Sequence, residues 1–275
     1  MAVDRFGNLH APNLSYARGK IIRNTEDDFR KLQRAWSLIR ERGPDNIYVF
    51  TGLEHSLPLA AEELAFADDE IAPAMCFERL KTLALEHLGG SPEADDVAVF
   101  NRLTGATMAT HLTLVRPGDV VVGVSASHSH PSVLRAAEHV GASFIDTAGV
   151  GAFRDAIATQ QSVTLVVLTR LAVTYDLLPL KAIESIIKLA HDKDALVYVD
   201  DAGGARVGPA AFGQPRMLEL GADIGATGLD KYGTAGPRFG LLAGPEGSRQ
   251  PYPSERLRVR HGSPTDALPG CRAYA

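Results

Sequence analysis

The chain is poor in cysteine and has no long apolar run. Its 275 residues include two cysteines, Cys76 and Cys271, which lie far apart in the sequence. Two distant thiols build neither a disulfide framework nor a zinc site, so we expect a reducing, cytoplasmic setting. No stretch is apolar for long enough to cross a membrane, and residues 1–13 lack the apolar segment of a secretory signal.

Basic charge and nucleotide-binding motifs are also missing. Lys and Arg number 28 against 33 Asp and Glu, which gives a net charge of −5. Because proteins bind nucleic acids largely by neutralising phosphates with basic side chains, we expect no nucleic-acid partner. Neither a Gly-x-x-x-x-Gly-Lys-Ser/Thr loop nor a Gly-x-Gly-x-x-Gly turn occurs, which disfavours nucleotide and dinucleotide binding.

What is present is an alternation of short apolar runs and amphipathic helical patterns. We expect strands near 97–100, 120–124, 142–145, 163–168, 196–199 and 239–243. We expect helices over 25–42, 72–88, a stretch that ends at 115, 131–140, 153–159, 180–191 and 217–220. This alternation predicts an α/β fold, a three-layer sandwich in which helices cover both faces of a mainly parallel sheet.

The chain divides into three regions by composition. Residues 1–95 read as an N-terminal helical segment, and residues 96–244 carry the alternating pattern of a large domain. Residues 245–275 are rich in Pro, Arg, Ser and Gly and have no sustained period. Such a segment rarely packs, so we expect an irregular tail.

Four groups of polar and small residues carry the candidate chemistry, and the first three fall at expected strand ends, where parallel sheets bind their ligands. In chain order they are Asn101 to Thr107, Ser125 to Ser132, Val199 to Gly204 and Thr227 to Lys231.

The two last groups suggest a specific chemistry. Asp200 ends a buried-looking strand, and Lys231 follows among glycines and small residues. Pyridoxal phosphate (PLP) needs an amine that holds it as a Schiff base and a carboxylate that keeps its ring nitrogen protonated. Free backbone N–H groups at a helix start, as near Gly105, bind phosphate. The pattern therefore favours a PLP site.

In this order the four groups resemble the fold type I PLP-dependent enzymes, and most of all the selenium transferase and class V aminotransferase branch. The resemblance runs from about residue 97 to 244 and includes proteins similar to L-seryl-tRNA(Sec) selenium transferase. It implies a PLP-dependent transferase-like large domain, a homodimer or higher homo-oligomer, and a transferase or lyase that acts on a small amino acid. Elimination, racemisation, transamination and group transfer at the β carbon all stay open.

The resemblance also implies roles for single residues. Lys231 would hold the cofactor and later carry a proton, and Asp200, rather than Asp201, would face the pyridine nitrogen. His130 would stack on the ring, with His128 as its competitor. Phosphate contacts would come from Thr104, Gly105, Ala106, Thr107 and Thr227. The glycine-rich turn at 233–237 would lie near the cofactor of a partner subunit.

The chain departs from the family pattern in three places. Gly203 stands where many relatives have His or Gln, and the loop 169–174 lacks the Asn that many carry. Family members continue into a smaller C-terminal domain, and we expect that domain to be missing here. We therefore expect a truncated or frame-shifted product whose genuine sequence ends near Gly244, and a catalytically dead member of the fold is one alternative.

Other interpretations compete with these assignments. His128, His130 and Asp200 or Asp201 could instead bind the metal of a hydrolase. Lys231 could be an ordinary surface lysine. Arg170 could contact a substrate carboxylate or be a solvated loop charge, and we favour the loop charge.

Overall fold

The structure is a computed structural model that describes residues 2–3, 9–10, 25–43, 60–68, 70–232 and 238–245. The chain forms two compact units, 1–51 and 52–275. The first contains the short antiparallel strands β1 (Ala2–Val3) and β2 (Leu9–His10) and the helix α1 (Thr25–Arg42). The bounds of α1 match the predicted helix. The expected tail, beyond the last residue of the final strand, lies outside the described residues.

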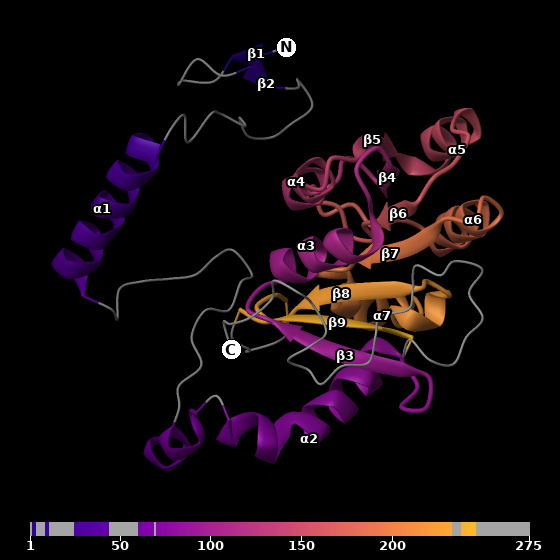
Figure 1. Ribbon diagram of the computed structural model, residues 1–275. Helices are drawn as coiled ribbons and strands as arrows, with labels where there is room; N and C mark the ends of the chain where they lie inside the picture. Colours follow the sequence, from indigo (N-terminus) through magenta and orange to yellow (C-terminus); the bar gives the residue numbers. More distant parts are fainter. Residues whose placement is uncertain are drawn as a thin grey trace. The chain divides into compact units, whose positions relative to one another are not determined.

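The second unit is built around one seven-stranded sheet with the order β3-β9-β8-β7-β6-β4-β5 (Figure 1). The strands are β3 (Asp95–Phe100), β4 (Val120–Ser125), β5 (Ser143–Ala148), β6 (Leu165–Leu168), β7 (Leu196–Asp200), β8 (Ile224–Gly228) and β9 (Gly240–Pro245). Strand β9 is antiparallel to both of its neighbours, and the strands from β8 to β5 pair in parallel. The mainly parallel sheet is confirmed.

Helices cover both faces of this sheet, as Figure 1 shows. They are α2 (Ile71–Leu88), α3 (Leu103–Leu114), α4 (Pro131–His139), α5 (Gly149–Thr159), α6 (Leu180–His191), α7 (Gly204–Phe212) and η3 (Leu218–Leu220). The short helix η2 (Ala61–Phe66) precedes α2 and has no buried residue. Buried residues of α3 and α4 pack on one face, and those of α2, α5, α6 and α7 pack on the other. The predicted three-layer α/β sandwich is therefore confirmed.

Side chains of the central strands alternate between two cores. In β7, Leu196 and Tyr198 pack with α3 and α4, whereas Val197 and Val199 pack with α5 and α6. Because both faces are covered, such strands read as continuous apolar runs, which is why the sequence reveals them. The same period of two places the side chain of Asp200 on the face covered by α3 and α4.

Two elements near the site are absent from the sequence-based prediction. Strand β8 contains two glycines, and a Cβ at Gly225 would lie 2.4 Å from the sulfur of Met217. Helix α7 contains Pro209 and also glycines where Arg170 approaches: a Cβ at Gly208 would lie 2.9 Å from Nη1 of Arg170. Low intrinsic propensity hides both elements, and contacts with distant residues stabilise them.

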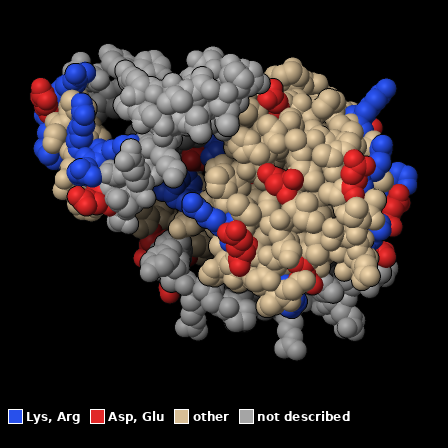
Figure 2. Space-filling model, turned by 90° about the horizontal axis from the view of Figure 1, so that it is seen from above, with Lys and Arg blue, Asp and Glu red and all other residues tan. Residues whose placement is uncertain are grey.

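On the face shown in Figure 2, acidic and basic side chains are interspersed around a broad area of uncharged residues. Among the helices in the described ranges, none is both long and apolar enough to span a membrane.

Candidate active site

The predicted site residues gather at the carboxyl ends of the sheet strands. Asp200 ends β7, His130 precedes α4, and Lys231 follows β8. The positive charge of Lys231 opposes the raised pKa of Asp200, and it adds to the loss of hydration that lowers the pKa of His130. Charges interact this way only over short distances within a protein. The three residues therefore belong to one site.

Asp200 is a buried acid without a hydrogen-bond partner for one oxygen. Its side chain is 4% exposed, and among the described residues Oδ1 has no partner. Burial and the neighbouring charge of Asp201 raise the pKa of Asp200 to about 7, against the opposing effect of Lys231. A buried carboxylate oxygen without a partner is costly and calls for an explanation. Oδ1 of Asp223 is a second such oxygen among the described residues, but only Asp200 combines it with a raised pKa and a place at a strand end. The protonated ring nitrogen of PLP is a cationic donor that would satisfy this oxygen of Asp200.

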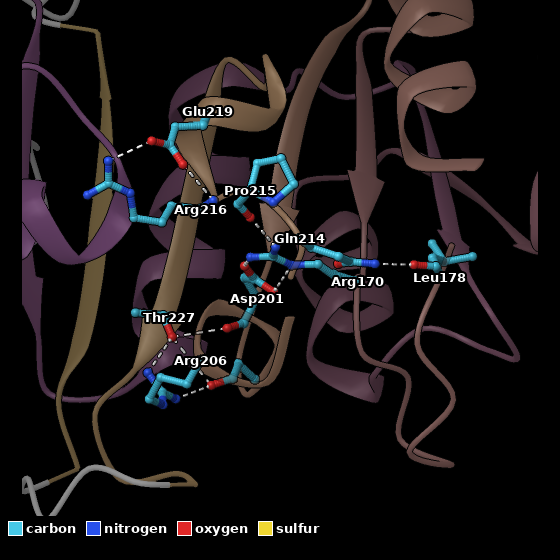
Figure 3. Close-up of polar contacts among 10 residues, drawn as sticks. Arg170, Leu178, Asp201, Arg206, Gln214, Pro215, Arg216, Glu219 and Thr227 are labelled. Atoms are coloured by element: carbon cyan, nitrogen blue, oxygen red, sulfur yellow. Dashed lines mark hydrogen bonds and ion pairs between the residues drawn. The ribbon is translucent and has the colours of Figure 1, made fainter. Parts of the chain in front are cut away.

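Asp201, by contrast, is paired with a buried arginine. Nε of Arg170 donates to its Oδ1 at 3.1 Å, Nη2 of Arg170 donates to its Oδ2, and Nη1 donates to the Pro215 carbonyl at 2.7 Å (Figure 3). Both charged side chains are fully buried. This geometry supports the choice of Asp200 over Asp201 for the ring nitrogen.

The interpretation of Arg170 as a solvated loop charge is wrong. Arg170 is 0% exposed, because its side chain is enclosed by Asp201, the Pro215 carbonyl and the glycines of α7. The glycines of that helix make the necessary space: a Cβ at Gly204 would lie 2.1 Å from Oδ1 of Asp201 and 3.2 Å from Cβ of Arg170. Sequence reasoning missed this pair, although the spacing of Gly204 and Gly208 on one helix face is a signal of close packing.

The start of α3 offers a place for an anion. Its N-cap residue, Arg102, makes no side-chain cap within the described structure, and no acid lies in the first turn. Thr104 is exposed there, and the Gly105 N–H bonds to the Arg102 carbonyl at 3.0 Å. Because the Gly105 N–H is already engaged, the N–H groups that precede it and the positive end of the helix dipole are what would favour phosphate at this helix start.

Two of the predicted phosphate contacts have buried hydroxyls. Thr107 is fully buried and shares a 2.9 Å hydrogen bond with the hydroxyl of Tyr198. Thr227 is also fully buried and donates to the Asp201 carbonyl at 3.0 Å. Ala106 lies in the same core as Tyr198. Of the predicted phosphate contacts, only Thr104 and Gly105 lie at an accessible helix start.

His130 caps the helix that follows it. Its Nδ1 accepts from the Ser132 N–H at 3.2 Å and lies 2.7 Å from the Ser132 hydroxyl, and Pro131 occupies the first turn. The residue is exposed, but partial loss of hydration at the ring, with the charges of Lys231 and Arg135, lowers its pKa. The cap therefore orients a neutral imidazole at the site. His128 is half-buried in the same loop.

Lys231 projects from a short segment, residues 228–232, which we call the Lys231 turn. Its side chain is 25% exposed, and Nζ lies 3.5 Å from Oδ1 of Asp230. Arg206, from α7, donates to the backbone carbonyls of Gly228 at 2.8 Å and Tyr232 at 3.1 Å. Sequence reasoning missed Arg206, since its sequence position gives no sign that it meets this turn.

Tyr232 fills the space beside Gly203. A Cβ at Gly203 would lie 2.5 Å from two carbons of the Tyr232 ring, so only glycine fits there with this ring in place. The Tyr232 ring also meets that of Tyr175, with centroids 6.2 Å apart. Burial and the hydrogen bond to Tyr175 raise the pKa of Tyr232 to about 12. The position at which many relatives carry His or Gln is thus covered by a neutral tyrosine.

The metal-hydrolase alternative is not favoured. Among the described residues, no group of three or more His, Cys, Asp or Glu side chains is arranged to hold a metal ion. Arg170 also occupies both carboxylate oxygens of Asp201.

Sequence relatives point in the same direction as the site geometry. No family model matches the chain. It is 33% identical over 229 residues to a UPF0425 pyridoxal phosphate-dependent protein of Methanothermobacter thermautotrophicus, covering 82% of this chain and 58% of that protein. It is 30% identical over 225 residues to a protein of the same name from Methanosphaera stadtmanae, covering 80% and 56%. The chain thus spans little more than half the length of these curated relatives.

Solved structures support the fold. Serine palmitoyltransferase of Sphingomonas wittichii matches with a TM-score of 0.54 and 16% identity, over 80% of this chain and 63% of that one. The SepCysS–SepCysE N-terminal domain complex matches with a TM-score of 0.50 and 15% identity, over 76% and 60%. The chain has the fold of the fold type I PLP-dependent enzymes. This confirms the fold-level resemblance found in the sequence. The narrower placement in the selenium transferase and class V branch stays a prediction.

Proposed function

We propose that this chain is the cofactor-binding part of a fold type I PLP-dependent enzyme that acts on a small amino acid. The observation that carries the proposal is Asp200, a buried acid with an unpaired oxygen at the end of β7, in electrostatic reach of Lys231. The names of the sequence relatives, which describe PLP-dependent proteins, support the same cofactor.

Each site residue takes a definite part in this proposal. The amine of Lys231 would hold the cofactor and would carry a proton to or from the substrate α carbon. The carboxylate of Asp200 would accept a hydrogen bond from the ring nitrogen and keep it protonated. His130 would contact the ring, and the start of α3 at Thr104 and Gly105 would bind the phosphate. When bound, the cofactor supplies an electron sink for charge that develops on the substrate.

The reaction is elimination, racemisation, transamination or group transfer at the β carbon. Which of these occurs depends on which substrate bond is oriented over the cofactor ring. A free amino acid is favoured over an aminoacyl-tRNA, since a net charge of −5 gives no basic excess for RNA. We place the enzyme in the cytoplasm as a homodimer or higher homo-oligomer, and the selenium transferase and class V branch is the family group we favour.

Absorbance spectroscopy tests the Schiff base directly. Purified protein mixed with PLP should develop a band at about 410–430 nm that borohydride fixes to the chain. The band should vanish in Lys231→Ala. Lys188→Ala is the matched control, because Lys188 lies on α6 in an exposed pair with Asp192 and should leave the band unchanged. A folded wild-type protein without the band would refute the proposal.

A further inference from the structure

Arg206 makes an unusual set of contacts for a residue outside the predicted site. Its Nε and both Nη atoms donate to four acceptors, one just after the end of β7, four residues before Arg206, and three in the distant segment 227–232. They are the carbonyls of Ala202 at 2.7 Å, Gly228 at 2.8 Å and Tyr232 at 3.1 Å, and the Thr227 hydroxyl at 3.1 Å. Two of these carbonyls lie on either side of Lys231 in sequence.

The same side chain also reaches the segment that presents the acid. Ala202 follows Asp200 and Asp201 at the end of β7, and the Thr227 hydroxyl that accepts from Arg206 donates to the Asp201 carbonyl. Figure 3 shows Arg206 beside Thr227 and below Asp201. One guanidinium therefore joins the segment that carries Asp200 to the Lys231 turn.

The helix that carries Arg206 is itself firmly held. Gly204 and Gly208 of α7 lie against the buried Arg170, whose partner is Asp201. Burial lowers the pKa of Arg206, and the nearby charges of Asp201 and Asp230 oppose that effect. An arginine presents several donors in a rigid planar fork, whereas a lysine offers one compact charge on a flexible stem.

We propose that Arg206 is a positioning residue for Lys231, which fixes the Lys231 turn relative to Asp200 and so sets where the amine meets the cofactor. The effect on the cofactor rests on the proposed function, whereas the contact between Arg206 and the Lys231 turn does not. Because the donors of Arg206 are engaged by backbone and by Thr227, Arg206 is not the arginine that binds a substrate carboxylate. Its effect on chemistry passes through Lys231.

The chain offers a matched control in Arg216. Arg206 and Arg216 both line a groove of about 820 Å³ between α2 and α7. Arg216 also donates to a backbone carbonyl, that of Glu86 at 2.7 Å, but its other partner is the exposed Glu219. Arg216→Gln therefore removes a similar side chain from the same groove without touching the Lys231 turn.

Hydrogen–deuterium exchange on the cofactor-free protein tests the contact, with wild type, Arg206→Lys, Arg206→Gln and Arg216→Gln compared. Both Arg206 variants should speed exchange in residues 228–232 by about tenfold or more, because two hydrogen bonds from a charged donor are lost. PLP titration should show weaker binding by a similar factor and a shifted pH for the change in Schiff-base absorbance. Arg216→Gln should change none of these.

The outcomes separate this inference from the proposed function. If wild type never forms the borohydride-fixed band, the proposed function fails, while exchange in 228–232 still decides the Arg206 contact. If wild type forms the band and the Arg206 variants lose only thermal stability, Arg206 is merely structural and the inference is overturned. Should both variants fail to fold, Thr227→Val removes one acceptor and keeps the shape. Unchanged exchange in 228–232 of Thr227→Val would then count against the inference.

Discussion

Replacement of Asp200 by asparagine should stabilise the cofactor-free protein at alkaline pH. In the folded wild-type protein, the pKa of Asp200 rises from 3.8 to about 7, because its charged form is buried and lies beside Asp201. The folded protein therefore binds this proton more tightly than the unfolded chain does. Stability contributed by the proton is present at low pH and is lost as the pH rises from about 4 through 7.

The size of the effect follows from that shift. A pKa change from 3.8 to about 7 lowers the free energy of unfolding by about 4 kcal/mol at pH 8, at 1.36 kcal/mol for each pKa unit. Asparagine has the shape of the protonated acid and cannot ionise, so Asp200→Asn should gain up to about 4 kcal/mol at pH 8 and less than about 2 kcal/mol at pH 5. Any water that enters the site lowers both figures.

Urea unfolding of the cofactor-free protein at pH 5 and pH 8 measures this difference. Asp201→Asn is the contrasting variant: it leaves the buried Arg170 without its charged partner and should destabilise the protein by about 3–5 kcal/mol. Two adjacent acids should thus give opposite signs. An Asp200→Asn protein that is no more stable than wild type at pH 8 would refute the argument that this acid is held at a cost to stability.

Two further predictions concern neighbouring residues. Arg170→Met should lower the free energy of urea unfolding by about 3–5 kcal/mol, because it leaves Asp201 charged and buried. The double variant Arg170→Met with Asp201→Leu should recover part of that loss. Fully additive losses in the double variant would contradict an energetic coupling between Arg170 and Asp201. His130→Ala should lower stability by about 1 kcal/mol through the lost cap of α4, whereas His130→Asn keeps a capping side chain and should preserve stability while weakening PLP binding. Thermal melts and PLP titrations separate the two effects, and equal PLP affinity in His130→Asn and wild type would argue against a ring contact.

The sequence predicted those strands and helices whose pattern of buried residues is regular along the chain. Strands β6 and β7 are covered on both faces, so their residues read as uninterrupted apolar runs. Helix α6 has one buried face, and the predicted bounds of 180–191 match the structure. The helix before Gly89 ends there because this residue adopts a left-handed conformation, with φ of +80°. In all of these, the controlling information is local.

The sequence could not predict features that depend on distant partners. The glycines of β8 and α7 look like loop residues until Met217 and Arg170 are placed against them. Thr107 and Thr227 have the residue type for phosphate contacts, but only the packing of Tyr198 and Arg206 shows that their hydroxyls face inward. Arg170 was misassigned for the same reason, because burial of a charge depends on its partner.

The place of β9 in the sheet has a consequence for the order in which the molecule folds. This strand lies between β3, the first strand of the sheet in sequence, and β8, and it pairs with both. Until β9 is in place, β3 and β8 present unpaired edges, and a pairing between distant segments forms late and slowly. The Lys231 turn lies between β8 and β9. The strand that joins β3 to the rest of the sheet is thus also the strand that closes the segment carrying the lysine.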